Sequence, residues 1–504
     1  MSDMTARTTR RELLKSIGAA ATISLWPRVS ASQVPRDAEP LHYVTLADVA
    51  KLIESRQVSP VEVTGLLLDR IASVDGALHS YVTVMADRAM DSARQAEREI
   101  LAGRYRGPLH GMPIGVKDLC YTRGVRTMGG TQVLADFVPD YDATVVDRLK
   151  TAGAVILGKL TLCEGAMGPY HPELEVPVNP WDATRWSGVS SSGSGVATAA
   201  GLCFGSIGTD TGGSIRYPSA VNGCVGLKPT YGRVSRHGVL ALAESMDHVG
   251  PMARTVEDAA IAFEAIAGFD PNDPTSRREA VTPVRAELAK GVKGLRIGYD
   301  RRYATEGVEP GLVQALDAVL AALTELGAEI VELTMPDVKQ VGLAWWQLST
   351  AEAAAFHADN FPARAKEYGA GFRDVLEYGA GISGVTYANA AKVRAEFSGR
   401  LERVLAQVDC LVCPSMSNAA SPKLADPFGP ELDEDWASLV INDVHTKPFN
   451  FSGSPTLSVP CGFSTDGLPF SVQFVGNALS EAMLCRIGHA FEQVTPWHDR
   501  HPTV

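Results

Sequence analysis

Helical and strand patterns alternate along most of this chain, and that alternation restricts its fold more than any other feature. Residues 143–162 (ATVVDRLKTAGAVILGKLTL) predict a helix, a turn and an apolar strand, and 195–210 (GVATAAGLCFGSIGTD) predict a helix running into a strand. The amphipathic segment 310–335 repeats this order. Strands separated by helices build layered sheets. We therefore expect an α/β fold: a single large α/β/α domain with a central mixed sheet covered by helices.

Other segments add to this outline. The stretch 45–105 has helical periodicity, while 109–118 (LHGMPIGVKD) and 293–302 (KGLRIGYDRR) read as strands, and 454–476 reads as two strands joined by a turn. Residues 270–295 begin polar and rich in proline, which indicates a loop or a boundary. We expect residues 40–504 to form the domain.

The first 31 residues have a different character. Adjacent Arg10 and Arg11 precede a short, weakly apolar stretch, and small residues follow near Ala31. This arrangement resembles a twin-arginine export signal. It predicts that 1–31 is an export signal segment and that the mature protein is periplasmic or secreted. The alternative is a basic amphipathic amino terminus on a cytoplasmic protein.

Composition and charge exclude several classes of protein. The 504 residues carry a formal net charge of -12, which argues against nucleic-acid binding and against binding to anionic membranes. No run of 18 apolar residues exists, so no helix is expected to span a membrane in the mature form. Eight cysteines are scattered through apolar runs, and the single C-x-x-C pair, Cys410 and Cys413, lies in a predicted buried strand. We expect core cysteines, no metal and no cofactor.

The stretch 208–216 (GTDTGGSIR) places two glycines directly before a serine. Glycines let backbone N–H groups approach a substrate closely, and a nucleophilic serine needs such donors for the oxyanion that its attack creates. Thr211, Gly212, Gly213 and Ser214 are therefore candidates for an oxyanion hole around a nucleophile. The alternative is an ordinary tight turn between a strand and a helix.

A nucleophilic serine also needs a base. The apolar strand GMPIGVKDL ends with Lys117, and burial would lower the pKa of that amine enough for it to act as a base. Ser190, in the serine cluster SGVSSSGSG, precedes Ser214 by 24 positions (214 − 190), the length of one helix and one strand. We therefore expect both serines to lie at the same end of a sheet. For Lys117 alone, a surface position is the alternative.

Five segments in this order, GVKDL, NPWDATRWSGVSSSGSG, GTDTGGSIRYPSA, GLKPTYGRVSRHGV and DHVGPMARTVEDA, resemble the amidase signature family. The resemblance runs from about residue 45 to the end and is densest over 107–262, which leaves 263–504 as a variable half that shapes the substrate pocket. It implies a serine hydrolase that cleaves carbon–nitrogen amide bonds with a Ser-Ser-Lys triad. Ser214 would form the acyl-enzyme, Ser190 would bridge, and Lys117 would be the base.

The resemblance carries further expectations for the site. The N–H groups of Thr211 to Ser214 would form the oxyanion hole, and three residues would support it: Ser191, Asp210 and Arg216. The peptide before the bridging serine is cis in the family, but Val189 stands where the family usually has glycine, so its geometry here stays open. Candidates for the substrate pocket are Met167, Tyr170, Trp345 and Trp346. The alternative for the two tryptophans is packing in the core.

The expected partner is a small-molecule amide substrate, with monomer and homodimer both open. Two other functions stay in view. A glutamine-hydrolysing component of an amidotransferase would need tRNA together with a cytoplasmic partner protein, which an export signal disfavours. A catalytically inactive binding protein on the same fold is disfavoured by the presence of Lys117, Ser190 and Ser214.

Overall fold

One sheet of eleven strands organises the protein. The computed structural model describes residues 40–423, 426–428 and 444–504. The strands follow one another across the sheet in the order β1-β3-β2-β4-β6-β5-β10-β11-β9-β7-β8. Their bounds are β1 Tyr81–Val84, β2 Pro113–Lys117, β3 Val155–Leu160, β4 Gly205–Asp210, β5 Val225–Lys228, β6 His248–Ala253, β7 Arg296–Tyr299, β8 Glu329–Glu332, β9 Cys410–Pro414, β10 Thr456–Phe463 and β11 Pro469–Val475.

The sheet is mixed. Strand β2 runs parallel to both β3 and β4, and β7 runs parallel to β8 and β9, whereas β4/β6, β5/β6, β5/β10, β10/β11 and β9/β11 pair in the antiparallel sense. Every residue of β2, β3, β4 and β5 is buried, which fits strands whose two faces are both covered. The predicted single α/β domain with a large mixed sheet is confirmed.

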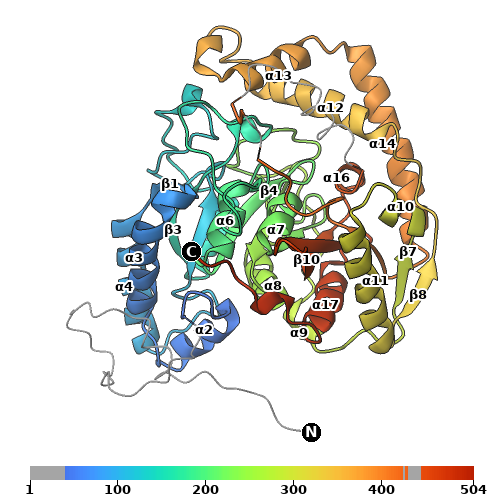
Figure 1. The fold of residues 1–504 in the computed structure, drawn as a ribbon. Helices are drawn as coiled ribbons and strands as arrows, with labels where there is room; N and C mark the ends of the chain where they lie inside the picture. The colour runs from blue at the N-terminus through green and yellow to red at the C-terminus, as the bar shows by residue number, and fades with distance from the viewer. Residues whose placement is uncertain (1–39, 424–425, 429–443) are drawn as a thin grey trace.

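Helices cover the sheet and extend beyond it (Figure 1). Helices α3 and α4 lie at the β1/β3 end, and α11 lies at the β7/β8 end. The helices are α2 Leu46–Glu54, α3 Pro60–Leu78, α4 Ala86–Leu101, α5 Thr144–Thr151, α6 Ser192–Ala199, α7 Arg216–Asn222, α8 Val256–Ile266, α9 Arg285–Leu288, α10 Arg301–Thr305, α11 Pro310–Glu325, α12 Val341–Phe356, α13 Ala370–Ala380, α14 Gly384–Leu405, α16 Lys447–Phe451 and α17 Glu481–Glu492. Short 3-10 turns lie at Gln132–Leu134, Glu164–Ala166, Ala365–Glu367 and Trp497–Asp499.

Local sequence sets the helix boundaries. Ser59 caps α3 by accepting a hydrogen bond from Val61 N–H, while Glu62 accepts one from Ser59 N–H, which together make a capping box. The helical prediction for 45–105 is correct for α2, α3 and α4 but wrong for β1, a four-residue edge strand between two long helices. Strand β1 is only half-buried, so its side chains gave no clear alternation.

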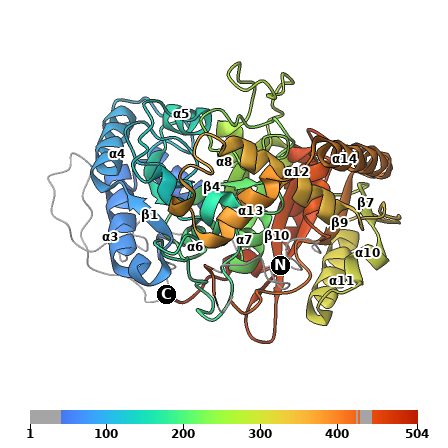
Figure 2. The same cartoon turned by 90° about the horizontal axis from the view of Figure 1, so that it is seen from above.

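Helices α12, α13 and α14 form a unit that we call the helical cap (Figures 1 and 2). In the view from above, α12 and α13 cross over the part of the sheet that holds β4 and β10. Apolar side chains of the cap, among them Trp345, Leu348, Val375, Phe397 and Leu401, belong to a second core cluster. The larger cluster surrounds the sheet and the helices on its faces.

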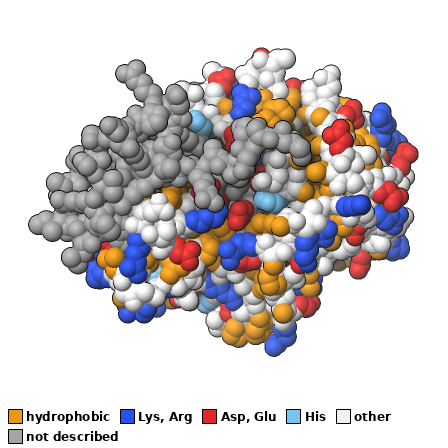
Figure 3. Space-filling model, turned by 90° about the horizontal axis from the view of Figure 1, so that it is seen from below, with side chains coloured by type: hydrophobic (Ala, Val, Ile, Leu, Met, Phe, Trp, Pro, Cys, Tyr) orange, Lys and Arg blue, Asp and Glu red, His pale blue; other side chains and the backbone are white. Residues whose placement is uncertain are grey.

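Several expectations can be compared with the described residues. All eight cysteines are buried and free, as predicted, and Cys410 and Cys413 lie in β9. Within the described ranges, no helix is long and apolar enough to cross a membrane. On the face in Figure 3, acidic and basic side chains are interspersed over the described surface. The predicted export signal, 1–31, lies outside the described residues.

Candidate active site

Three chain segments meet at the carboxyl edge of β2 and β4. Lys117 is the last residue of β2, and Asp210 is the last residue of β4. Because the two strands are parallel, with Val116 paired to Ile207, their carboxyl ends lie side by side. The loop after β4 leads to α7, and the serine cluster around Ser190 leads into α6. The predicted residues of the site are therefore neighbours in space.

Lys117 is fully buried among hydroxyl groups. Its Nζ donates to Ser190 Oγ at 2.7 Å, Ser191 Oγ at 3.0 Å and Thr209 Oγ1 at 2.7 Å. Burial lowers the pKa of Lys117 from 10.5 to about 8, although the more distant charges of Asp210 and others act in the opposite direction. The amine is thus poised between its charged and neutral forms near neutral pH.

A second buried lysine shows what distinguishes Lys117. Lys159, on the neighbouring strand β3, is also fully buried, but its Nζ lies 3.2 Å from Asp118 Oδ1 and donates to Cys120 O and Thr127 Oγ1, each at 2.7 Å. A buried ammonium is stabilised by such a carboxylate. Within the described ranges, Lys117 forms no ion pair of this kind, so its three hydroxyl neighbours leave it free to lose its proton.

Ser190 and Ser214 lie at this edge in adjoining segments. Ser191 N–H donates to Ser214 O at 3.3 Å, which places the serine cluster beside the loop after β4. The peptide between Val189 and Ser190 is cis. Ser190 is 1% exposed and Ser214 9%, and Ser191 Oγ also contacts the Thr209 backbone, with its N–H at 3.2 Å and its carbonyl at 3.1 Å.

The carbonyl groups of the loop 210–214 are all engaged, which fixes the orientation of each peptide plane. The donors come from both halves of the chain. They are Asn450 Nδ2 to Asp210 O (3.2 Å), Trp345 Nε1 to Thr211 O (2.8 Å), Thr446 Oγ1 to Gly212 O (2.5 Å), Tyr217 N to Gly213 O (2.7 Å) and Ser191 N to Ser214 O (3.3 Å).

The N–H groups of residues 211–214 differ in whether they already donate a hydrogen bond. Gly213 N–H donates to Asp210 Oδ1 at 2.9 Å, so this member of the expected oxyanion hole is already hydrogen-bonded. The N–H groups of Thr211, Gly212 and Ser214 have no acceptor among the described residues. These three are the donors that the loop leaves available for a ligand oxygen.

A buried ion pair between Arg216 and Asp210 stabilises the loop 210–214. Arg216 and Asp210 are both 0% exposed, and Arg216 Nη2 lies 2.9 Å from Asp210 Oδ1 while Nε lies 2.9 Å from Oδ2. Arg216 also donates to Asn450 Oδ1 at 2.6 Å and to Thr446 O at 2.9 Å. Burial alone would raise the pKa of Asp210, but the Arg216 guanidinium holds it well below its usual range. The carboxylate therefore stays charged and keeps its contacts with the loop.

The four predicted pocket residues are all buried, between 5% and 6% exposed. Tyr170 donates its hydroxyl to Ser192 Oγ at 2.6 Å, and Trp345 donates its indole N–H to the loop. Trp346 packs against Tyr378 of α13, with ring centroids 5.8 Å apart. The structure thus places Trp345 beside the candidate site and Trp346 within the helical cap.

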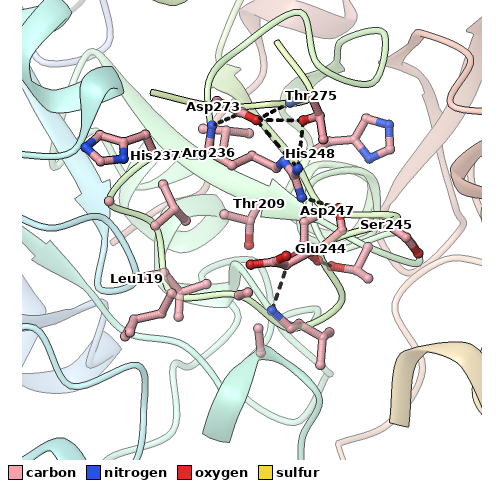
Figure 4. Close-up of a pocket in the computed structure, with 18 of the residues that line it drawn as sticks. Leu119, Thr209, Arg236, His237, Glu244, Ser245, Asp247, His248, Asp273 and Thr275 are labelled. Atoms are coloured by element: carbon pink, nitrogen blue, oxygen red, sulfur yellow. Dashed lines mark hydrogen bonds and ion pairs between the residues drawn. The ribbon is translucent and has the colours of Figure 1, made fainter. Parts of the chain in front are cut away.

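A cavity of about 650 Å³ adjoins the loop (Figure 4). Thr209 and Thr211 line it, but Lys117, Ser190 and Ser214 do not. On one side of the cavity Arg236 donates to Thr275 Oγ1 at 2.7 Å. The cavity therefore borders Thr209, whose hydroxyl group contacts the Lys117 amine.

Asp247 is a site residue that the sequence did not single out, although it lies in the quoted segment DHVGPMARTVEDA. It lines the cavity and accepts hydrogen bonds from Thr211 Oγ1 at 2.5 Å, Leu242 N at 2.9 Å and Ala243 N at 3.1 Å. Burial raises the pKa of Asp247. The position of an acid within a motif was the available signal, but only the fold shows that it contacts Thr211.

Comparisons with known proteins find relatives over most of the chain. The family model described as Amidase matches residues 62–485. "Putative amidase AmiD" of Mycobacterium tuberculosis is 46% identical over 468 residues, which is 93% of this chain and 98% of that protein. A glutamyl-tRNA(Gln) amidotransferase subunit of Thermosynechococcus vestitus is 40% identical over 91% of this chain and 99% of its own length. The native peptide amidase of Stenotrophomonas maltophilia has a similar structure, with a TM-score of 0.79, 31% identity, and coverage of 91% of this chain and 98% of that one.

Proposed function

Because this chain belongs to the amidase family and is an amide-hydrolysing enzyme, we propose that it acts through an acyl-enzyme on Ser214, with Ser190 and Lys117 as its proton relay. The observation that carries this proposal is the contact of 2.7 Å between Lys117 Nζ and Ser190 Oγ in a fully buried site. An amine whose pKa is about 8 can take a proton from a neighbouring hydroxyl at neutral pH.

The proposed acylation step uses the relay in order. Neutral Lys117 accepts the proton of Ser190, Ser190 accepts the proton of Ser214, and Ser214 Oγ attacks the amide carbonyl carbon. The carbonyl oxygen becomes an oxyanion, which the N–H groups of Thr211, Gly212 and Ser214 are available to stabilise. As the carbon–nitrogen bond breaks, the relay returns a proton to the leaving nitrogen, so the amine or ammonia departs neutral.

Deacylation repeats the relay with water. Water loses a proton through Ser190 to Lys117, and its oxygen attacks the ester carbon. The bond to Ser214 Oγ breaks, Ser214 regains its proton, and the acid is released. General acid–base transfer of this kind is typically worth about 10²- to 10⁴-fold in rate.

The test of this proposal is the variant Ser214→Ala. We expect it to fold as the wild type does, by circular dichroism, and to hydrolyse a simple aryl amide at no measurable rate. A fluorophosphonate probe should add its mass to the wild-type peptide that contains Ser214 and to no peptide of the variant. Wild-type turnover by Ser214→Ala would overturn the mechanism, and an unlabelled, inactive wild type would favour a binding protein on this fold.

The substrate class is also part of the proposal. The similarity to a peptide amidase and to a bacterial aryl acylamidase (26% identity, TM-score 0.82) supports a small-molecule amide as the substrate. A panel of primary amides, anilides, peptide amides and esters, compared by kcat/KM, would rank these classes. A protein that cleaved none of them would contradict the proposed class.

A second candidate rests on the relatives named as glutamyl-tRNA(Gln) amidotransferase subunits. On this alternative the chain would hydrolyse glutamine for a partner protein. Glutamine added to the same panel separates the two, because only the alternative predicts that glutamine is the preferred substrate.

We further propose that residues 1–31 export the protein by the twin-arginine route, on the strength of Arg10, Arg11 and the apolar stretch after them. Changing both arginines to lysine should keep the protein in the cytoplasm, as measured by cell fractionation with the mature size as the marker of export. Unchanged export would refute this part of the proposal.

A further inference from the structure

The indole of Trp345, in the helical cap, lies directly on the loop that carries Ser214. Its Nε1 donates to Thr211 O at 2.8 Å, and the side chain is only 5% exposed. A Cβ atom added to Gly212 would lie 2.5 Å from Trp345 Cζ2. The ring thus occupies the space that any other residue at 212 would fill.

This contact determines the direction of one particular N–H group. The C=O and the N–H of a trans peptide point in opposite directions, so a carbonyl held toward α12 turns its partner N–H away from α12. The carbonyl of Thr211 and the N–H of Gly212 belong to one peptide. Among the described residues, Trp345 is the donor to that carbonyl, and the Gly212 N–H has no acceptor.

We propose that Trp345 is a positioning residue of the reaction, which orients the Gly212 N–H toward the oxyanion and so connects the helical cap to catalysis. This inference rests on the proposed function, because it presumes that Ser214 creates an oxyanion at this loop. A movement of α12 would tilt the 211–212 peptide and weaken that donor.

Contacts from Thr446 and Lys447 hold the Trp345 indole and the loop 210–214 in their relative positions. The ammonium of Lys447, the first residue of α16, lies 5.1 Å from the centroid of the Trp345 ring. Thr446, just before it, donates to Gly212 O at 2.5 Å, which fixes the next peptide of the loop. The loop is therefore held by the helical cap on one peptide and by the start of α16 on the following one.

The test replaces Trp345 by Phe, which keeps an aromatic ring and removes the N–H. We expect kcat for an anilide to fall about 10- to 100-fold with little change in KM, somewhat less than the 10²- to 10³-fold typical of deleting an oxyanion donor. The matched control is Trp181→Phe, since Trp181 also donates its indole N–H to a backbone carbonyl, Asn222 O at 2.8 Å, but outside the loop 210–214. The control should stay within about twofold of wild type, as expected for a conservative change away from the oxyanion.

Three readouts separate positioning from a general loss of structure. In Trp345→Phe the affinity for phenylboronic acid, whose tetrahedral adduct carries an oxyanion-like oxygen, should fall in step with kcat/KM. The thermal midpoint and the pH at half-maximal activity should stay at their wild-type values. Should Trp345→Phe fail to fold, incorporation of 3-benzothienylalanine at position 345, which replaces the N–H by sulfur with nearly the same shape, provides the same comparison.

The outcomes distinguish this inference from the proposed function. If Ser214→Ala is inactive and the 345 variants keep the wild-type kcat and boronate affinity, the role of Trp345 is overturned and the mechanism stands. If Ser214→Ala remains active, the mechanism itself fails. Suppose instead that kcat/KM falls only because KM rises, and that the thermal midpoint falls as well. Trp345 would then contribute to packing alone.

Discussion

Acidifying the solution below pH 8 should switch the enzyme off by protonating Lys117. Burial lowers the pKa of this amine from 10.5 to about 8, which corresponds to roughly 3.4 kcal/mol between its charged and neutral forms. At pH 7 about one molecule in ten then carries the neutral amine, against about one in 3,000 for a lysine with the unshifted pKa. The buried position thus raises the fraction of active base by about 300-fold.

The sign of the pH dependence follows from the active form. Only the neutral amine accepts a proton from Ser190, so log kcat/KM for a neutral anilide should rise by about one unit per pH unit below 8 and level off above it. Initial rates between pH 5.5 and 9.5, with unfolding monitored at each pH, measure this curve. A flat profile from pH 6 to 9 in the wild type would refute the role of Lys117, as would near-normal activity in Lys117→Ala.

The pH profile needs a control for a second buried group, the carboxyl group of Glu164. Burial raises the pKa of Glu164 from 4.5 to about 8, and its Oε2 accepts a hydrogen bond from Gly369 N–H at 3.0 Å, at the start of α13. Its deprotonation would occur in the same pH range. The variant Glu164→Gln removes that titration and keeps an acceptor, so the midpoint near 8 should persist if Lys117 is responsible. Disappearance of the midpoint in Glu164→Gln would assign the profile to Glu164 and contradict our argument.

Three further outcomes follow from the described contacts. Arg216→Met leaves the buried Asp210 carboxylate without its partner and should lower the free energy of unfolding by about 3–5 kcal/mol in urea titrations, so an unchanged midpoint would contradict the structural role of the pair. Gly213 has φ +140°, and a Cβ there would lie 2.4 Å from the Tyr217 ring, so Gly213→Ala should lose most of its kcat with a native circular-dichroism spectrum; full activity would show that the loop geometry is wrong. The eight buried cysteines should react with a thiol reagent only after denaturation, and fast labelling of the native protein would contradict their burial.

The sequence predicted the frame of the fold because its helices and central strands are strongly periodic. Segments such as α5 followed by β3 have one clear amphipathic helix and one fully buried strand, and each was recognised from local pattern alone. Strands β5 and β6 were not predicted. Strand β5 has only four residues, both strands contain glycine, and β6 also contains a proline, so their strand geometry depends on pairing with β10 and β4.

The candidate site likewise has residues that the sequence could predict and contacts that it could not. Candidates such as Lys117 and Ser190 could be named from motifs, because Lys117 ends an apolar strand and Ser190 lies in a serine cluster just before a helix. The contact between Trp345 and Thr211, by contrast, spans 134 positions and depends on how α12 packs over the sheet. No local pattern specifies such a contact. The hydrogen bond that occupies Gly213 N–H was equally hidden, since it needs the exact path of the loop around Asp210.

The two buried lysines differ in their charged neighbours, and on the proposed mechanism this difference makes Lys117 the reactive one. Lys159 and Lys117 lie on adjacent parallel strands and are equally buried, so desolvation destabilises the ammonium of both. Lys159 has the carboxylate of Asp118 at 3.2 Å, an ion pair between two buried side chains. Lys117 has hydroxyl groups instead, which hydrogen-bond the amine in either protonation state but supply no negative charge. On the proposed mechanism, the absence of a carboxylate beside Lys117 is what allows its amine to act as a base near neutral pH. A carboxylate introduced beside it through Thr209→Asp should therefore raise the pKa of Lys117 and move the activity profile to higher pH.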